Sequence, residues 1–79
     1  MNQLQNTILE ITKMYLGPAA QVFLERQAKF HMGGISFQDI NESHIPELLK
    51  WIRISAGLII DNKAEALVVN INTALKKLQ

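Results

Sequence analysis

The chain has 79 residues, of which 48% are hydrophobic and 19% are charged, and its net charge at neutral pH is +1. This length and composition predict one globular domain with a thin core and exclude a disordered chain. The small, scattered charge argues against a nucleic-acid partner, and the absence of cysteine excludes disulfides and thiolate metal sites.

The N-terminal segment lacks the basic region and the continuous apolar stretch of a signal peptide. The apolar runs are far shorter than the ~20 residues that a membrane-spanning helix needs. We therefore expect a cytoplasmic protein that has no membrane partner.

Apolar residues recur at helical spacing from Leu4 to Tyr15, which predicts a first helix. Gly17 provides a backbone that can end this helix, and Pro18 suits the first turn of the next one. Gly17 and Pro18 are therefore predicted to form a tight structural corner between two helices.

A second helix is expected from about Pro18 to Met32, because the pair Gly33 and Gly34 then interrupts the helical pattern. Its polar residues Gln21, Glu25 and Lys29 fall on the opposite side of a helical wheel from its apolar residues. The predicted inward residues are Ala19, Val22, Phe23 and Phe30.

The segment after the two glycines is short and mixed in character. Ser36, with Asp39 three residues later, can cap a helical turn that places Ile35, Phe37 and Ile40 in the core. A short strand is the alternative, but it would lack a partner strand.

A third helix is predicted from about Ser43, acting as its N-cap, to Ile60, with Pro46 tolerated in the first turn. Its apolar residues cover about two-thirds of the circumference, more than a one-sided stripe requires. A narrow polar strip holds Lys50, Arg53, Gly57 and Asp61. The main stripe contains Ile45, Leu48, Leu49, Ile52, Ala56 and Ile59, and a second stripe contains Trp51, Ile54 and Leu58.

A fourth helix is expected to begin at Asp61 or Asn62, with Asn62 and Glu65 forming a capping box. A strand through residues 66–71 is disfavoured because the helical stripe continues on both sides of it. That stripe contains Ala64, Leu67, Val68, Ile71, Leu75 and Leu78.

No repeat or linker divides the chain, so residues 1–79 are expected to form one domain. The predicted fold class is all-α: a compact four-helix bundle of the orthogonal type with an extra short helical turn.

The chain carries no recognisable catalytic motif. His31 and His44 lack the spacing of a metal-binding helix, and the serines lack both a glycine-flanked elbow and a paired base. We therefore predict no catalytic residue, no metal site, no cofactor and no enzymatic activity.

Arg26 falls between Val22 and Phe30 on a helical wheel, at the margin of the predicted inward face. A guanidinium there needs a partner, because an unpaired buried charge is costly. Two structural expectations are that its side chain extends along the edge of the helix to solvent, or that it forms an ion pair with Asp39 or Glu42. The functional expectation is an anchor for the carboxylate of a partner protein.

Apolar residues left over from the four inner stripes predict an association surface. The alternative is that the third helix is buried on both sides, and periodicity alone does not separate the two. We expect a homo-oligomer, most simply a dimer, or a complex with another signalling protein. A small DNA-binding regulator that uses Lys50 and Arg53 is the alternative function. The predicted interface residues are Trp51, Ile54, Leu58, Leu24 and Val69.

The stretch YLGPAAQVFLER, from Tyr15 to Arg26, carries a family resemblance. It resembles the opening of a small helical domain of uncharacterised function that follows kinase, response-regulator or other signalling modules in bacterial proteins. The resemblance implies an accessory or interaction module in signalling, with Gly17 and Pro18 as structural residues and no known active site.

Overall fold

The computed structural model describes residues 2–78 and is all-helical over that range, with no β-strand among them. The all-α prediction is therefore confirmed, and the alternative strand at residues 66–71 is not formed. Three short 3-10 turns connect the longer helices: η1 (Gly17–Ala19), η2 (Phe37–Asp39) and η3 (Glu42–His44). The α-helices are α1 (Gln3–Leu16), α2 (Ala20–His31), α3 (Ile45–Ile60) and α4 (Lys63–Lys76).

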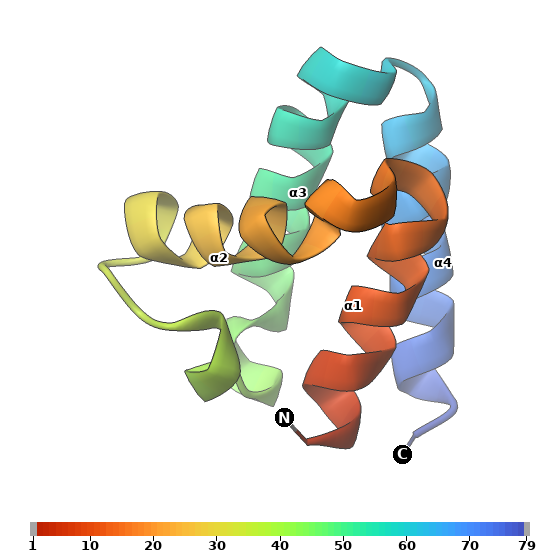
Figure 1. Ribbon diagram of the computed structural model, residues 1–79. Helices are drawn as coiled ribbons and strands as arrows, with labels where there is room; N and C mark the ends of the chain where they lie inside the picture. Colours follow the sequence, from red (N-terminus) through yellow and green to blue (C-terminus); the bar gives the residue numbers. More distant parts are fainter. Residues whose placement is uncertain (1, 79) are drawn as a thin grey trace.

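The axes of α1, α3 and α4 are roughly aligned, and α2 lies across them (Figure 1). α4 runs antiparallel to α1 and α3 and packs against both of them. α2 crosses in front of α3 and packs against α1 and α3. No helix among residues 2–78 has both the length and the apolar character to cross a membrane.

The bend between α1 and α2 lies at Gly17 and Pro18. Gly17 has a φ of 61°, which favours glycine, and its N–H donates to the carbonyl of Lys13. Pro18 then occupies the first turn of η1, where no intrahelical N–H bond is lost. The chain thus changes direction sharply between α1 and the crossing helix α2 within a few residues.

The core is formed by aliphatic side chains from all four helices together with two side chains from the loop around η2. Phe37 and Ile40 reach it from that loop, where the Ser36 side chain accepts a hydrogen bond from the Gln38 N–H, as predicted for a cap. The largest fully buried apolar side chains are Phe37, Ile8, Leu24, Ile40, Leu48, Ile52, Leu67 and Ile71.

The face that α2 buries matches the predicted one only at Phe23, which is buried. Val22 and Phe30 are exposed, Phe30 at 67%, and Ala19 lies at the exposed surface before the helix. The helix buries instead a row rotated toward Leu24 and Ala28. Small alanine side chains allow the crossing helix to approach its neighbours closely, which explains why this row faces inward.

The starts of α3 and α4 also differ from the predicted capping. Asn41, not Ser43, caps the turn before α3: its Oδ1 accepts the Ser43 N–H at 2.9 Å. The Asn62–Glu65 capping box is absent, because Asn62 has helical backbone angles and makes no side-chain cap bond. The chain turns instead at Asp61, whose φ of 55° breaks α3 before α4 begins.

Two predicted inner residues lie at the surface because their helices extend beyond the core. Ile59, near the end of α3, is exposed, and Ile60 packs against the core in its place. Leu78 follows the last turn of α4 and is also exposed.

Side-chain polar contacts join four pairs of elements: α1 with the η2 loop, α2 with α3, α1 with α4, and α3 with α4. The Gln5 amide of α1 donates to the carbonyls of Gln38 at 2.5 Å and Ile40 at 2.9 Å. The Ser55 hydroxyl of α3 donates to Gln27 Oε1 of α2 at 2.7 Å. Gln5 and Gln27 are buried and Ser55 is half-buried, so these side chains need their hydrogen bonds, which hold the η2 loop against α1 and α2 against α3. The remaining pairs are Asn70 with Tyr15, between α4 and α1, and Arg53 with Glu65, between α3 and α4.

Candidate interaction surface

The side of α3 that faces away from the core carries large apolar side chains. Leu58 is 87% exposed and Ile54 is 48% exposed. These two residues and Trp51 are spaced by three and four positions, so they form one stripe along the helix. Large exposed apolar side chains that adjoin one another are typical of an association surface.

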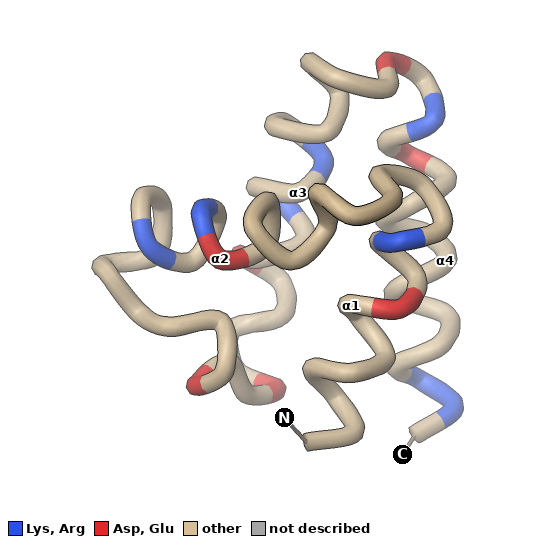
Figure 2. Tube along the Cα trace, viewed as in Figure 1, with Lys and Arg blue, Asp and Glu red and all other residues tan. Residues whose placement is uncertain are grey.

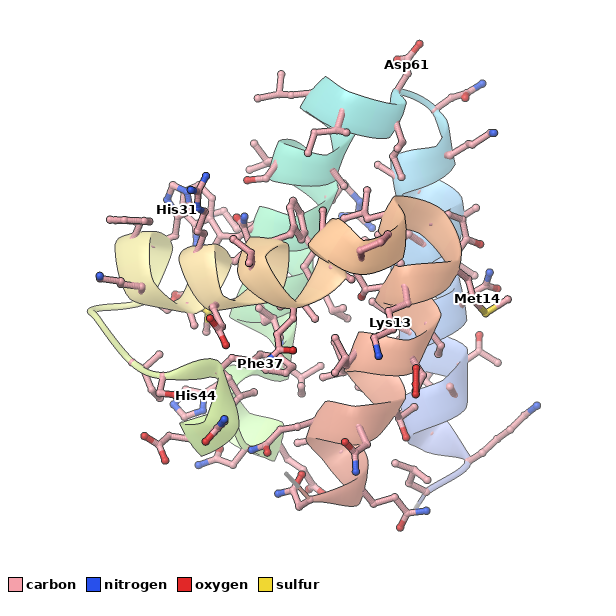
Figure 3. All side chains as sticks on the ribbon, in the orientation of Figure 1. Lys13, Met14, His31, Phe37, His44 and Asp61 are labelled. Carbon is pink, nitrogen blue, oxygen red and sulfur yellow. The ribbon has the colours of Figure 1, made fainter. Side chains whose placement is uncertain are left out.

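Trp51 is half-buried because a side chain of α2 covers it. The His31 ring stacks on it with a centroid separation of 4.2 Å and an interplanar angle of 11°. Figure 3 shows His31 at the end of α2, on the side turned toward α3. Lys50 Nζ lies 5.0 Å from the centre of the Trp51 ring, within cation–π range. The ring is therefore fixed at the inner edge of the exposed stripe.

Two other predicted interface residues do not join this stripe. Leu24 is 0% exposed and belongs to the core, so its assignment to an interface is wrong; α2 buries the row that contains it. Val69 is exposed, but it lines a groove of about 330 Å³ between α3 and α4, on the flank of α3 away from His31.

The groove beside Val69 holds the basic residues of the alternative DNA-binding hypothesis. Arg53 Nε donates to Glu65 Oε2 at 2.8 Å, and its Nη2 donates to Oε1 of the same carboxylate at 3.3 Å. Figure 2 shows that Lys and Arg are spread over all the helices and interleaved with acidic residues. The groove therefore has one ion-paired cation, Arg53, and a second cation, Lys50, that forms no salt bridge with residues 2–78, rather than a basic patch.

Arg26 lies on the exposed side of α2 with Val22 and Phe30, not at the margin of a buried face. Within residues 2–78 it forms no salt bridge, so the expected ion pair with Asp39 or Glu42 is not observed. The predicted position of Arg26 at the margin of the buried face is wrong because α2 buries a different face from the predicted one.

Polar side chains among residues 2–78 form no site with obvious chemistry. No group of three or more acidic or histidine side chains in this range is placed to hold a metal ion. His44 acts structurally: its Nδ1 accepts the Asn41 N–H at 3.0 Å. A cavity of about 490 Å³ is lined mainly by amides and aliphatic residues, including Asn2, Leu4 and Leu75.

The His31–Trp51 stack was not anticipated from the sequence. The two residues lie in different helices, and no local pattern indicates which aromatic rings will meet across a helix crossing. The stripe of Trp51, Ile54 and Leu58 was anticipated, because its helical spacing is a local property.

Comparison of the chain with models of protein families, with curated proteins and with solved structures found no match.

Proposed function

We propose that this chain is a non-enzymatic protein–protein interaction module that associates with itself, in a regulatory or signalling role in the cytoplasm. The observation that carries the proposal is the stripe of Trp51, Ile54 and Leu58 on α3. Burying a leucine or isoleucine side chain completely is worth roughly 1.5–3 kcal/mol. A surface of this size supports a weak, reversible complex rather than a permanent one.

The proposed signalling role rests on the resemblance of the Tyr15–Arg26 stretch and on the place of that stretch in the fold. Tyr15 forms its hydrogen bond with Asn70 of α4, and Gly17 and Pro18 make the corner into α2. These residues serve the architecture, which we class as a compact four-helix bundle of the orthogonal type. The motif thus fits a structural part of an accessory module and leaves α3 available for a partner.

DNA binding ranks below self-association. Glu65 places a negative charge beside Arg53, one of the two cations on which that hypothesis depends. Binding of random duplex at two salt concentrations separates the two functions, because contacts with several phosphates make affinity fall steeply with salt.

Replacing Leu58 with glutamate should abolish self-association and leave the fold intact. Leu58 is almost fully exposed, so its loss costs little stability, whereas a carboxylate cannot be buried against an apolar partner surface. Sedimentation velocity over a range of concentrations measures the association, and circular dichroism checks the fold.

Val22→Glu is the matched control, because Val22 is an exposed apolar residue on α2 and lies outside the stripe. It should associate like the natural chain. A natural chain that stays monomeric at every concentration, or equal association of the two variants, contradicts the proposal.

A further inference from the structure

A row of residues on one side of α3 is complementary to a second, antiparallel copy of itself. Its two ends carry opposite charges, and its large central side chain would face a glycine of the other copy. The row is Lys50, Ile54 and Gly57 of α3, followed by Asp61 directly after the last residue of the helix, at spacings of four, three and four positions. Three of them are exposed and Gly57 is partly exposed. The row begins with a cation and ends with an anion, and between them a large residue precedes a glycine.

Gly57 has no role that the chain itself explains. It lies in the interior of α3, and a Cβ built on it would meet no atom within 4 Å. Glycine in a helix interior is unfavourable relative to alanine, so its presence points to a need outside the chain. The close approach of another backbone is such a need.

We propose that a second copy of the chain packs antiparallel across α3, with Ile54 of each copy against Gly57 of the other. In this register Lys50 of each copy faces Asp61 of the other. Both pairs are centred between Ser55 and Ala56, so one two-fold axis satisfies all of them. The inference rests on the proposed function, since it specifies the geometry of that self-association.

The exposed stripe fits the same arrangement. In a two-fold antiparallel pair, each flank of a helix meets the same flank of its partner. Leu58 of one copy then lies on the same flank as Trp51 of the other, about 3 Å along the helix from its level. The large Trp51 ring spans that offset and covers the most exposed apolar residue. Trp51 is held in place by His31 of its own chain, so this part of the surface is formed before the partner arrives.

Charge selects the antiparallel direction over the parallel one. Lys50 and Asp61 each lie about 8 Å along the helix from the centre of the row, at a rise of 1.5 Å per residue. A parallel pair would place Lys50 against Lys50 and Asp61 against Asp61, and like charges across an interface are unfavourable. Figure 3 shows the Asp61 side chain pointing away from the bundle at the corner between α3 and α4.

Cysteine cross-linking tests the register, since the natural chain contains no cysteine. Ile54→Cys chains and Gly57→Cys chains are mixed in equal amounts under mild oxidation, and the products are separated by mass. We expect the mixed disulfide to form roughly ten-fold faster than either symmetric disulfide, because only the facing pair meets the distance limit of a disulfide. A mixture of Val22→Cys and Gly57→Cys chains is the control.

The outcomes separate this inference from the broader proposal. A dimer in sedimentation that gives mainly symmetric disulfides, or that cross-links no faster than the control, overturns the antiparallel register and leaves self-association standing. A strict monomer at every concentration overturns both.

Charge reversal gives a second test that does not alter the centre of the row. Lys50→Glu and Asp61→Lys should each weaken the dimer at least several-fold, and the double variant should recover most of the loss. Lys29→Glu, an equal charge change on α2, is the control. Because Asp61 has a positive φ, the fold of each variant is checked by circular dichroism at a concentration where the natural chain is monomeric. Failure of the double variant to recover contradicts the pairing of these residues.

Discussion

Replacing Phe37 with alanine is expected to lower the free energy of unfolding by about 3–5 kcal/mol. Phe37 is 2% exposed, although it comes from a short 3-10 turn rather than from one of the α-helices. Its ring closes the core beneath α2, and a large cavity would remain after truncation. Domains of this size are stable by only about 5–15 kcal/mol, so the variant should be largely unfolded at moderate urea concentrations.

Phe30→Ala is the matched control for this experiment, because the same side chain is removed from an exposed position on α2. It should change the free energy of unfolding by no more than about 0.5 kcal/mol. Urea titration followed by circular dichroism measures both variants. Equal effects of the two substitutions would mean that α2 and the η2 loop are packed differently from the arrangement described.

Replacing Gln5 with alanine should cost about 2–3 kcal/mol, a large effect for a polar residue. Gln5 is 3% exposed and closes three contacts: its amide reaches the carbonyls of Gln38 and Ile40, and its Oε1 accepts the Asn2 N–H. Truncation leaves the carbonyls of Gln38 and Ile40 without this partner, and the bond to Ile40 is buried, where a polar group without a partner is costly.

Gln3→Ala provides the comparison, since Gln3 is an exposed glutamine in the same first turn of α1. Thermal unfolding of the two variants should show a clear loss for Gln5 alone. A Gln5→Ala variant as stable as Gln3→Ala would show that the Gln5 amide does not hold the η2 loop to α1.

Helix ends were largely predictable because they depend on local chemistry. Gly17 with Pro18 and Gly33 with Gly34 interrupt the helical pattern, and all three glycines adopt a positive φ. The start of α4 was predicted less well. Asparagine is a common N-cap residue, but the chain turns one residue earlier, at the positive φ of Asp61. Asn62 therefore has helical backbone angles and makes no side-chain cap bond.

The buried face of α2 was not predictable from its own sequence. Val22, Phe23 and Leu24 are consecutive apolar residues, so several rotations of the helix bury a similar amount of apolar surface. The choice among them is made by the rest of the fold, through the η2 loop and the approach of α3. Arg26 was misplaced for the same reason.

Buried amides are not predictable from helical periodicity, because polar residues are normally found at the surface. Gln5 and Gln27 are both buried, and each side chain makes the hydrogen bonds that burial requires. Their partners lie in distant parts of the sequence, which no periodic pattern reveals. The second stripe of α3 was found because its spacing is local, whereas the burial of Leu24 depends on the whole fold.

Gly57 and Asp61 imply a conflict between folding and assembly. Alanine in place of Gly57 should stabilise the single chain by about 0.5–1 kcal/mol, and glycine suits the φ of 55° at Asp61 better than aspartate does. A search for heat-resistant variants would therefore select Gly57→Ala and Asp61→Gly. Both exchanges alter the row along α3. The most thermostable variants of this protein should therefore also have the weakest tendency to dimerise.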